Sequence, residues 1–227
     1  QKPQAVAIAL GWATRGDGKL LKMFSPMTVQ IISLVIFLGF LWLASRGVTS
    51  LKRIGTIAGT STFIMGILYI LLVIAAPAIT GAKLTAIDFS YKNMMPDFNF
   101  AYFTTVSMLV FAVGGCEKIS PYVNNMHNPS KEFPKGLIVL AIMVAVSAFL
   151  GSIAMGMMFD PNHIPADLKM NGQYYAFQML GKYYGVGNLF LIIYALANMT
   201  AQISALVFSI DAPLKVLLAD TDKKYIP

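Results

Sequence analysis

Charged residues, histidine and cysteine are scarce in this sequence of 227 residues. Asp, Glu, Lys and Arg make up 12% of the chain, below the roughly one quarter of soluble domains, while 57% is hydrophobic. The single cysteine, Cys116, excludes an internal disulfide, and the two histidines have no metal-ligand spacing around them. We therefore expect no metal and no cofactor. The formal charge of +7 in so apolar a chain indicates loop topology and anionic lipid, and disfavours nucleic acid as a partner.

Long apolar segments predict several membrane spans, because a spanning helix needs about 20 consecutive apolar residues. Four uninterrupted segments reach that length, at residues 27–45, 54–79, 136–159 and 186–210. A fifth, 101–122, is apolar enough but is broken at 114–115, and polar loops are expected over 82–99 and 160–185. Small residues in the second segment, such as Gly59 and Gly66, predict close approach of helix backbones. The prediction is an all-α membrane protein forming a single transmembrane domain over residues 1–227.

The basic residues of the loops predict the orientation of these spans. Lys and Arg are more frequent after the first, the broken and the last span than in the alternate loops, which places those three loops in the cytoplasm. We expect a multi-pass protein of the cell (plasma) membrane, which in a bacterium is the inner membrane. The chain begins with Gln1 and has no basic, apolar leader, so we expect an internal part of a longer protein.

A pair of glycines, Gly114-Gly115, interrupts the fifth segment. Two glycines lower helix propensity by about 2 kcal/mol relative to two alanines. Non-helical backbone at membrane depth survives only where it lines a cavity or is buried in protein. One interpretation is an unwound helix whose carbonyl and N–H groups bind the ammonium and carboxylate of an amino acid. The alternative is a glycine pair that only permits tight helix packing.

Glu117 follows the glycines and, apart from Asp211 near the end of the last span, is the only acid in the apolar segments. At membrane depth an ionised carboxylate is costly, so Glu117 would hold a proton and couple its movement to that of a substrate. Near the cytoplasmic mouth it would only pair with Lys118 or another basic residue. Thr200 and Ser204 share a helix face, but such hydroxyls more often bond to backbone than to an ion.

Two motifs resemble a known family. Residues 128–135, NPSKEFPK, resemble the N-P-x-[KR]-x-[aromatic or aliphatic]-P-[KR] signature of amino-acid permeases of the amino acid–polyamine–organocation (APC) superfamily. Residues 111–117, FAVGGCE, are similar to the F-x-x-x-G-x-E stretch where the sixth helix of that family unwinds. Residues 198–204 and the tail 219–227 resemble helix eight and the following segment of its glutamate/GABA antiporter branch. The resemblance covers nearly the whole chain, as helices four to eight.

The resemblance implies part of a five-plus-five inverted-repeat, LeuT-like transporter fold with a discontinuous helix. The substrate-binding residues that it implies are a bulky gate and the unwound backbone behind it, Phe111, Ala112, Val113, Gly114, Gly115 and Cys116. Glu117 matches the carboxylate of helix six and is the candidate for proton coupling. Gln202 stands where the antiporter branch often has an acid, and we expect it to hydrogen-bond a polar substrate. This departure leaves coupling to a proton, to sodium or to exchange open.

We therefore expect secondary active transport of amino acids by alternating access, in a permease or antiporter with glutamate/GABA-like relatives. The expected partners are an amino-acid substrate, the lipid bilayer and a proton as coupling ion. One alternative is a cation-coupled importer of neutral or cationic amino acids. Another is a channel-like or non-transporting membrane subunit in which the glycine pair serves packing. No His, Asp, Glu and Ser set shares spans in the manner of a catalytic site, so we do not expect an enzyme.

Overall fold

Every regular element in the described part of the chain is a helix. The computed structural model describes residues 2–45, 48–87, 90–91, 95–113, 123, 126–160, 164–165 and 167–220. In chain order the elements are α1 (Lys2–Arg15), the 3-10 helix η1 (Leu20–Met23), α2 (Pro26–Ser45), α3 (Val48–Thr80), α5 (Phe100–Val113), α6 (Pro129–Met158), α7 (Leu168–Tyr183) and α8 (Leu189–Asp220).

Among the described residues, three helices are long and apolar enough to cross a membrane. The segments that qualify are Thr56–Thr80 in α3, Pro129–Met158 in α6 and Leu189–Ile210 in α8, and α2 adds the shorter apolar stretch Pro26–Gly39. The uninterrupted spans predicted from the sequence each overlap one of these four helices. Large apolar side chains such as Ile31, Leu71 and Phe149 are more than half exposed on their surfaces. The expectation of an all-helical chain with membrane-length apolar helices is confirmed.

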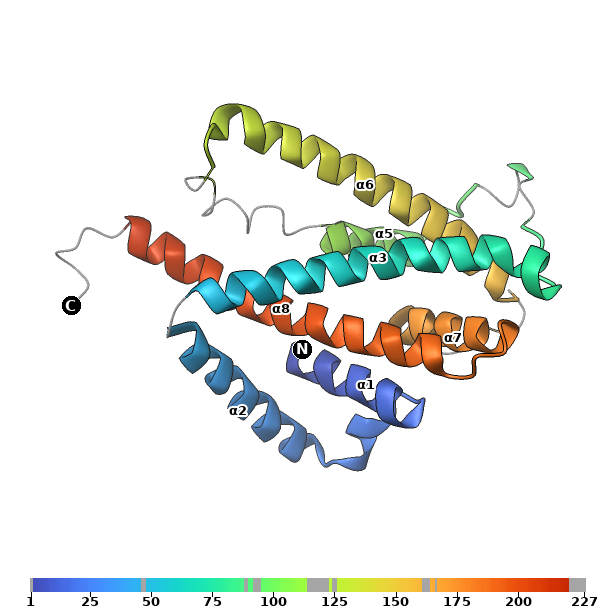
Figure 1. Ribbon diagram of the computed structural model, residues 1–227, viewed down its shortest axis with the longest axis horizontal. Coiled ribbons are helices and arrows are strands. Elements are labelled where there is room, and N and C mark those ends of the chain that lie inside the picture. Colours follow the sequence, from blue (N-terminus) through green and yellow to red (C-terminus); the bar gives the residue numbers. More distant parts are fainter. Residues whose placement is uncertain are drawn as a thin grey trace.

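Helix α8 is central, because α1, α2, α3 and α7 all pack against it, while α6 packs on α3 (Figure 1). The largest fully buried side chains include Val73 of α3, Phe177 and Leu180 of α7, and Leu191 of α8. These residues belong to one apolar core, to which α1 contributes Trp12. The core therefore lies where α7 closes over the ends of α3 and α8.

Helix α7 is the main departure from the sequence-based expectation, which places a polar loop over residues 160–185. That expectation is wrong for residues 168–183, which are helical. Tyr174, Phe177 and Leu180 recur every three residues and are at most 4% exposed. They form a buried face of the kind that period predicts for a helix. Lys, Asn, Gln and Gly elsewhere in the helix lower the average hydropathy, so the segment does not resemble a membrane span.

The turn from α7 into α8 depends on glycines. Gly185 has a φ of +68°, a left-handed conformation that side chains disfavour. The N–H of Val186 donates to the carbonyl of Gly181 at 2.9 Å, and that of Gly185 to the carbonyl of Lys182 at 3.2 Å. This is the hydrogen-bond pattern of a Schellman motif. The turn brings Gly187 so close to α7 that a Cβ on Gly181 would lie 1.9 Å from the Gly187 carbonyl oxygen.

Helices α6 and α8 are longer than the predicted spans. Helix α6 begins at Pro129 rather than at 136, and the N–H of Glu132 donates to the Asn128 carbonyl at 2.9 Å. Proline suits the first helical position because its missing N–H would have no intrahelical partner there. Helix α8 continues through Pro213 to Asp220 instead of ending near 210. Within the NPSKEFPK segment, Asn128 is the N-cap of α6 and the remaining residues form its first turns.

Candidate functional site

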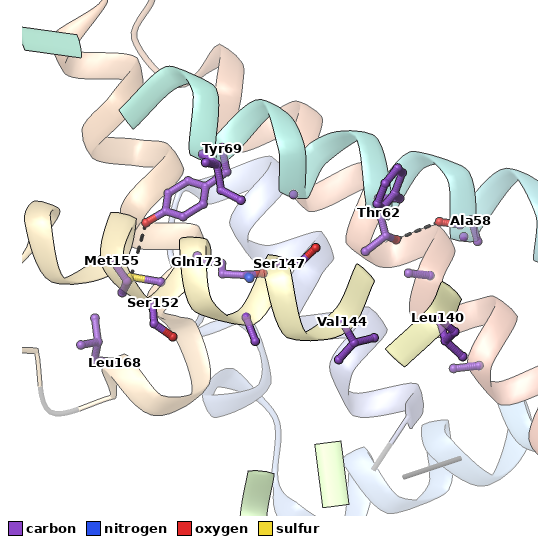
Figure 2. Close-up of a pocket in the computed structure, with 18 of the residues that line it drawn as sticks. Ala58, Thr62, Tyr69, Leu140, Val144, Ser147, Ser152, Met155, Leu168 and Gln173 are labelled. Atoms are coloured by element: carbon purple, nitrogen blue, oxygen red, sulfur yellow. Dashed lines mark hydrogen bonds between the residues drawn. The ribbon is translucent and has the colours of Figure 1, made fainter. Parts of the chain in front are cut away.

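A cavity of about 1210 Å³ lies between α3, α6, α7 and α8. Figure 2 shows Tyr69 and Thr62 on α3 facing the side chains of α6 across it. The lining is mostly apolar or small, with hydroxyl groups from Thr62, Ser147, Ser152 and Ser204. The Tyr69 hydroxyl donates to the Met155 sulfur at 3.8 Å. The cavity is larger than the few hundred cubic ångströms that a small ligand occupies.

Three of the glycines that line this cavity face open space. A Cβ on Gly59, Gly66 or Gly151 would meet no heavy atom within 4 Å. The sequence predicts close helix approach at Gly59 and Gly66, and the described residues do not provide it, since both glycines line the cavity. The Thr62 hydroxyl donates to the Ala58 carbonyl of its own helix at 2.8 Å. The polar side chains of the α3 wall are therefore Thr62, whose hydroxyl is bonded to backbone, and Tyr69, whose hydroxyl is bonded to Met155.

Gln202 lies on α8, beside this cavity rather than in its lining. Ala201, Ser204 and Ala205 are the neighbouring α8 residues that line the cavity, and Gln202 is not among the lining residues described. Its Nε2 donates to Oδ1 of Asn198, one turn earlier, at 3.3 Å. The hydroxyl of Thr200 donates to the Ala197 carbonyl at 2.7 Å, as expected for a hydroxyl that satisfies its own helix.

A series of hydrogen bonds continues from Gln202 to α7. Nδ2 of Asn198 donates to the Tyr174 hydroxyl at 2.6 Å. We call Gln202, Asn198 and Tyr174 the polar ladder. The Tyr174 ring stacks on Trp12 of α1, with ring centroids 5.1 Å apart and 5° between the planes. The ladder thus connects α8 to α7, and the ring stacking on Trp12 extends the contact to α1.

Hydrogen bonds continue from Trp12 to a carboxylate at the start of α7, that of Asp167. Nε1 of Trp12 donates to Oδ1 of Asn171 at 3.2 Å, and Nδ2 of Asn171 donates to Asp167 at 2.9 Å. The Tyr175 hydroxyl donates to the same carboxylate at 3.1 Å. The hydrogen bond from Asn171, with a smaller contribution from Tyr175, holds the pKa of Asp167 below its ordinary value. Asp167 is therefore ionised at neutral pH.

The structure reaches only part of the site that the sequence predicts. Phe111, Ala112 and Val113 are the last three residues of α5 as described, and the description does not include their side chains. Gly114, Gly115, Cys116 and Glu117 lie outside the described residues. The predicted break at 114–115 and the predicted role of Glu117 therefore stay predictions. Among the described residues, no group of three His, Cys, Asp or Glu side chains could hold a metal ion.

The polar ladder is the feature that sequence reasoning missed. Asn198 and Tyr174 are 24 positions apart, so no local period connects them. The available signal is the spacing of Asn198 and Gln202, two amides four residues apart in an apolar helix. That spacing places both amides on one face of α8.

Nearly the whole chain matches a known protein family. Residues 6–227 match the amino acid permease family. The chain belongs to this family. Membership confirms the prediction of an APC-superfamily protein. It also confirms that the family consists of transporters and not of enzymes.

Several curated relatives of this chain are bacterial. The chain is 55% identical over 229 residues to the aspartate/glutamate permease AcaP of Lactococcus lactis, covering 100% of this chain and 47% of that protein. It is 25% identical over 201 residues to the inner membrane transporter YjeM of Salmonella typhimurium, covering 81% of this chain and 40% of that protein. The chain thus spans less than half the length of these relatives. No solved structure matches it.

Proposed function

We propose that this chain is part of a transporter of acidic amino acids that works by alternating access. The observation that carries the proposal is the 55% identity to an aspartate/glutamate permease over the whole chain. Membership of the amino acid permease family and the three membrane-length helices support it. The proposed location is the bacterial inner membrane, in agreement with the relative YjeM, an inner membrane transporter.

The proposed substrate site is the predicted break in the helix that begins as α5. Unwinding at Gly114-Gly115 would leave free N–H groups at the start of one half-helix and free carbonyls at the end of the other. The N–H end carries positive partial charge and would bind a carboxylate, whereas the carbonyls would bind the ammonium. Phe111 would cover the ligand, and Gln202 would contribute a polar contact from α8. The fold proposed around this site is the five-plus-five inverted repeat with a discontinuous helix.

Glu117 is the proposed coupling group. A carboxylate in an apolar span is costly when ionised, so proton uptake there would accompany one half of the transport cycle. The resemblance to the glutamate/GABA antiporter branch supports exchange of one amino acid for another. Gln202 is neutral where that branch often has an acid, so Glu117 would hold the coupling proton without a second carboxylate on α8.

The experiment is counterflow in proteoliposomes that contain the protein and a panel of unlabelled amino acids. We expect saturable accumulation of labelled glutamate or aspartate when the internal amino acid is acidic, and its loss in Gly115→Leu. Gly39→Leu is the matched control, because Gly39 lies on the exposed surface of α2 and a Cβ there meets no atom within 4 Å.

Two results would count against the proposal. If the folded protein exchanges only neutral or cationic amino acids, the importer alternative replaces it. If labelled substrate equilibrates without stimulation by internal amino acid, and Gly115→Leu behaves like Gly39→Leu, the glycine pair is a packing device and the protein is not a carrier.

A further inference from the structure

Ser204 of α8 is a buried polar residue that lines the cavity between α3, α6, α7 and α8. Its side chain is 7% exposed, and in the described part of the chain it makes no hydrogen bond. Thr200 and Ser209, on the same helix, instead donate to carbonyls of that helix, each at 2.7 Å. Every fully buried side-chain oxygen or nitrogen among the described residues has a partner. The Ser204 oxygen has none, so it reaches the surface of the cavity.

Two further hydroxyls line the cavity from α6, those of Ser147 and Ser152 (Figure 2). Neither makes a hydrogen bond within the residues that the structure describes. The cavity lining that is described contains no charged side chain. A polar ligand would therefore be held on these walls by hydrogen bonds rather than by ion pairs. Each serine hydroxyl offers one donor and two acceptor lone pairs for this purpose.

The hydroxyl of Ser204 lacks an acceptor for its proton. A helical serine often supplies one by donating to the carbonyl one turn earlier, and Ser204 does not do so. An unpaired polar group in mostly apolar surroundings costs free energy. Carboxylates accept hydrogen bonds from hydroxyl groups, and bonds to an ionised acceptor are the stronger kind. A substrate carboxylate in the cavity would supply the missing acceptor.

We propose that this cavity is part of the substrate path, and that Ser204 donates a hydrogen bond there to a carboxylate of the acidic amino acid. Ser147 and Ser152 add hydroxyls from α6. The space is kept open by glycines such as Gly66 and Gly151, at which a Cβ would meet no heavy atom within 4 Å. With a volume of about 1210 Å³, the cavity has room for an amino acid together with its hydration. The inference rests on the proposed transport of acidic amino acids.

A purely structural role would also suit a small residue at position 204. In that case the hydroxyl rotates onto a carbonyl of its own helix, or another part of the protein fills the cavity. The two roles differ in what the loss of the hydroxyl changes. A structural contact affects the amount of folded protein and the maximal rate, whereas a substrate contact affects the apparent affinity.

The first test compares Ser204→Ala with Ser209→Ala in the counterflow assay with labelled glutamate. We expect Ser204→Ala to raise KM about 3- to 20-fold, the effect of one lost hydrogen bond, with the maximal rate within about twofold. Ser209→Ala is the matched control, because it removes an exposed hydroxyl of the same helix that is bonded to backbone, and its KM should equal that of the wild type. A KM increase in both variants, or in neither, would overturn the inference while the proposed transport stands.

Gly151→Leu tests the path without changing Ser204, and so also serves if Ser204→Ala does not fold. Since a Cβ on Gly151 meets no described atom within 4 Å, the leucine side chain would enter the cavity and leave the described packing intact. We expect the folded variant to lose most of its exchange, whereas Gly39→Leu, on the exposed surface of α2, keeps it. The thermal midpoints of both variants should match that of the wild type.

Three outcomes would go against the inference. If Gly151→Leu exchanges like Gly39→Leu, the substrate does not pass through the cavity. If Gly151→Leu fails to fold where Gly39→Leu folds, another part of the protein fills the cavity. Both results leave the proposed transport standing. If the wild type exchanges no amino acid, the proposed function and the inference fail together.

Discussion

The close contact between α7 and the turn that follows it predicts that Gly181 tolerates no side chain. In Gly181→Ala the new Cβ would lie 1.9 Å from the carbonyl oxygen of Gly187. The two atoms would have to separate by at least about 1 Å to reach ordinary contact. Backbone hydrogen bonds of the Schellman motif and the left-handed φ of +59° at Gly187 restrict such a movement. We expect a loss of about 2 to 4 kcal/mol, at the upper end for an overpacked site.

Gly172, on the same helix, is the matched control. A Cβ there would lie 3.5 Å from Cδ1 of Leu168 and 3.6 Å from Cε of Met155, which are ordinary van der Waals distances. Since alanine favours a helix over glycine by about 1 kcal/mol, Gly172→Ala should be neutral or slightly stabilising. The two variants make the same chemical change on one helix and are expected to act in opposite directions.

Thermal unfolding of the purified protein in detergent measures this difference. Trp12 is buried against Tyr174 and Tyr175, so its fluorescence reports the docking of α7. We expect the midpoint to fall by about 5 to 10 °C in Gly181→Ala, and to stay level or rise in Gly172→Ala. Equal midpoints for the two variants would refute the argument, because they would show that the turn yields without cost.

Two further predictions concern α7. Phe177 is 1% exposed and stacks on Tyr194, with centroids 4.6 Å apart, so Phe177→Ala should lower stability by about 3 to 5 kcal/mol in the same thermal assay, and an unchanged midpoint would contradict this. The lowered pKa of Asp167 means that its carboxylate stabilises the fold fully above the ordinary aspartate pKa, and that this contribution disappears as the pH falls through the lower folded value. The difference in midpoint between wild type and Asp167→Asn should therefore shrink below about pH 4, and a difference that grows with acidity would contradict the assignment.

The sequence predicts the membrane helices well, because length and hydropathy alone decide whether a segment spans. Helix α7 escapes this logic, since its stability comes from a narrow buried face and not from average hydropathy. Phe177 shows why this packing is hard to predict. Its partners Tyr69 and Tyr194 come from two other helices, and no local sequence pattern predicts contacts between distant helices. Fold class was predictable, whereas the packing that builds the core was not.

The candidate site, too, was predictable from the sequence only in part. Gln202 could be named from resemblance alone, because a motif fixes its place in the chain. Its hydrogen bond to Asn198 follows from helical spacing, but the bond onward to Tyr174 depends on how α7 docks. Gly59 and Gly66 show the converse, since their spacing predicts a close neighbour and the described structure places a cavity there. Spacing identifies a face of a helix and leaves open what that face meets.

Helix α6 packs against the other described helices near its C-terminal end. A rotation about that end would therefore displace the opposite end most. Its buried residues are Ala154 and Met158, and the contacts that Met155 and Met157 make with Tyr69 and Thr85 lie on the same few turns. Figure 1 shows the opposite end of α6 standing away from α3. A helix rises about 1.5 Å per residue, so the first turn of α6 is roughly 40 Å from this attachment. A rotation of about 10° there would carry the start of the NPSKEFPK segment roughly 7 Å, so a small adjustment in the core becomes a large displacement at the far end.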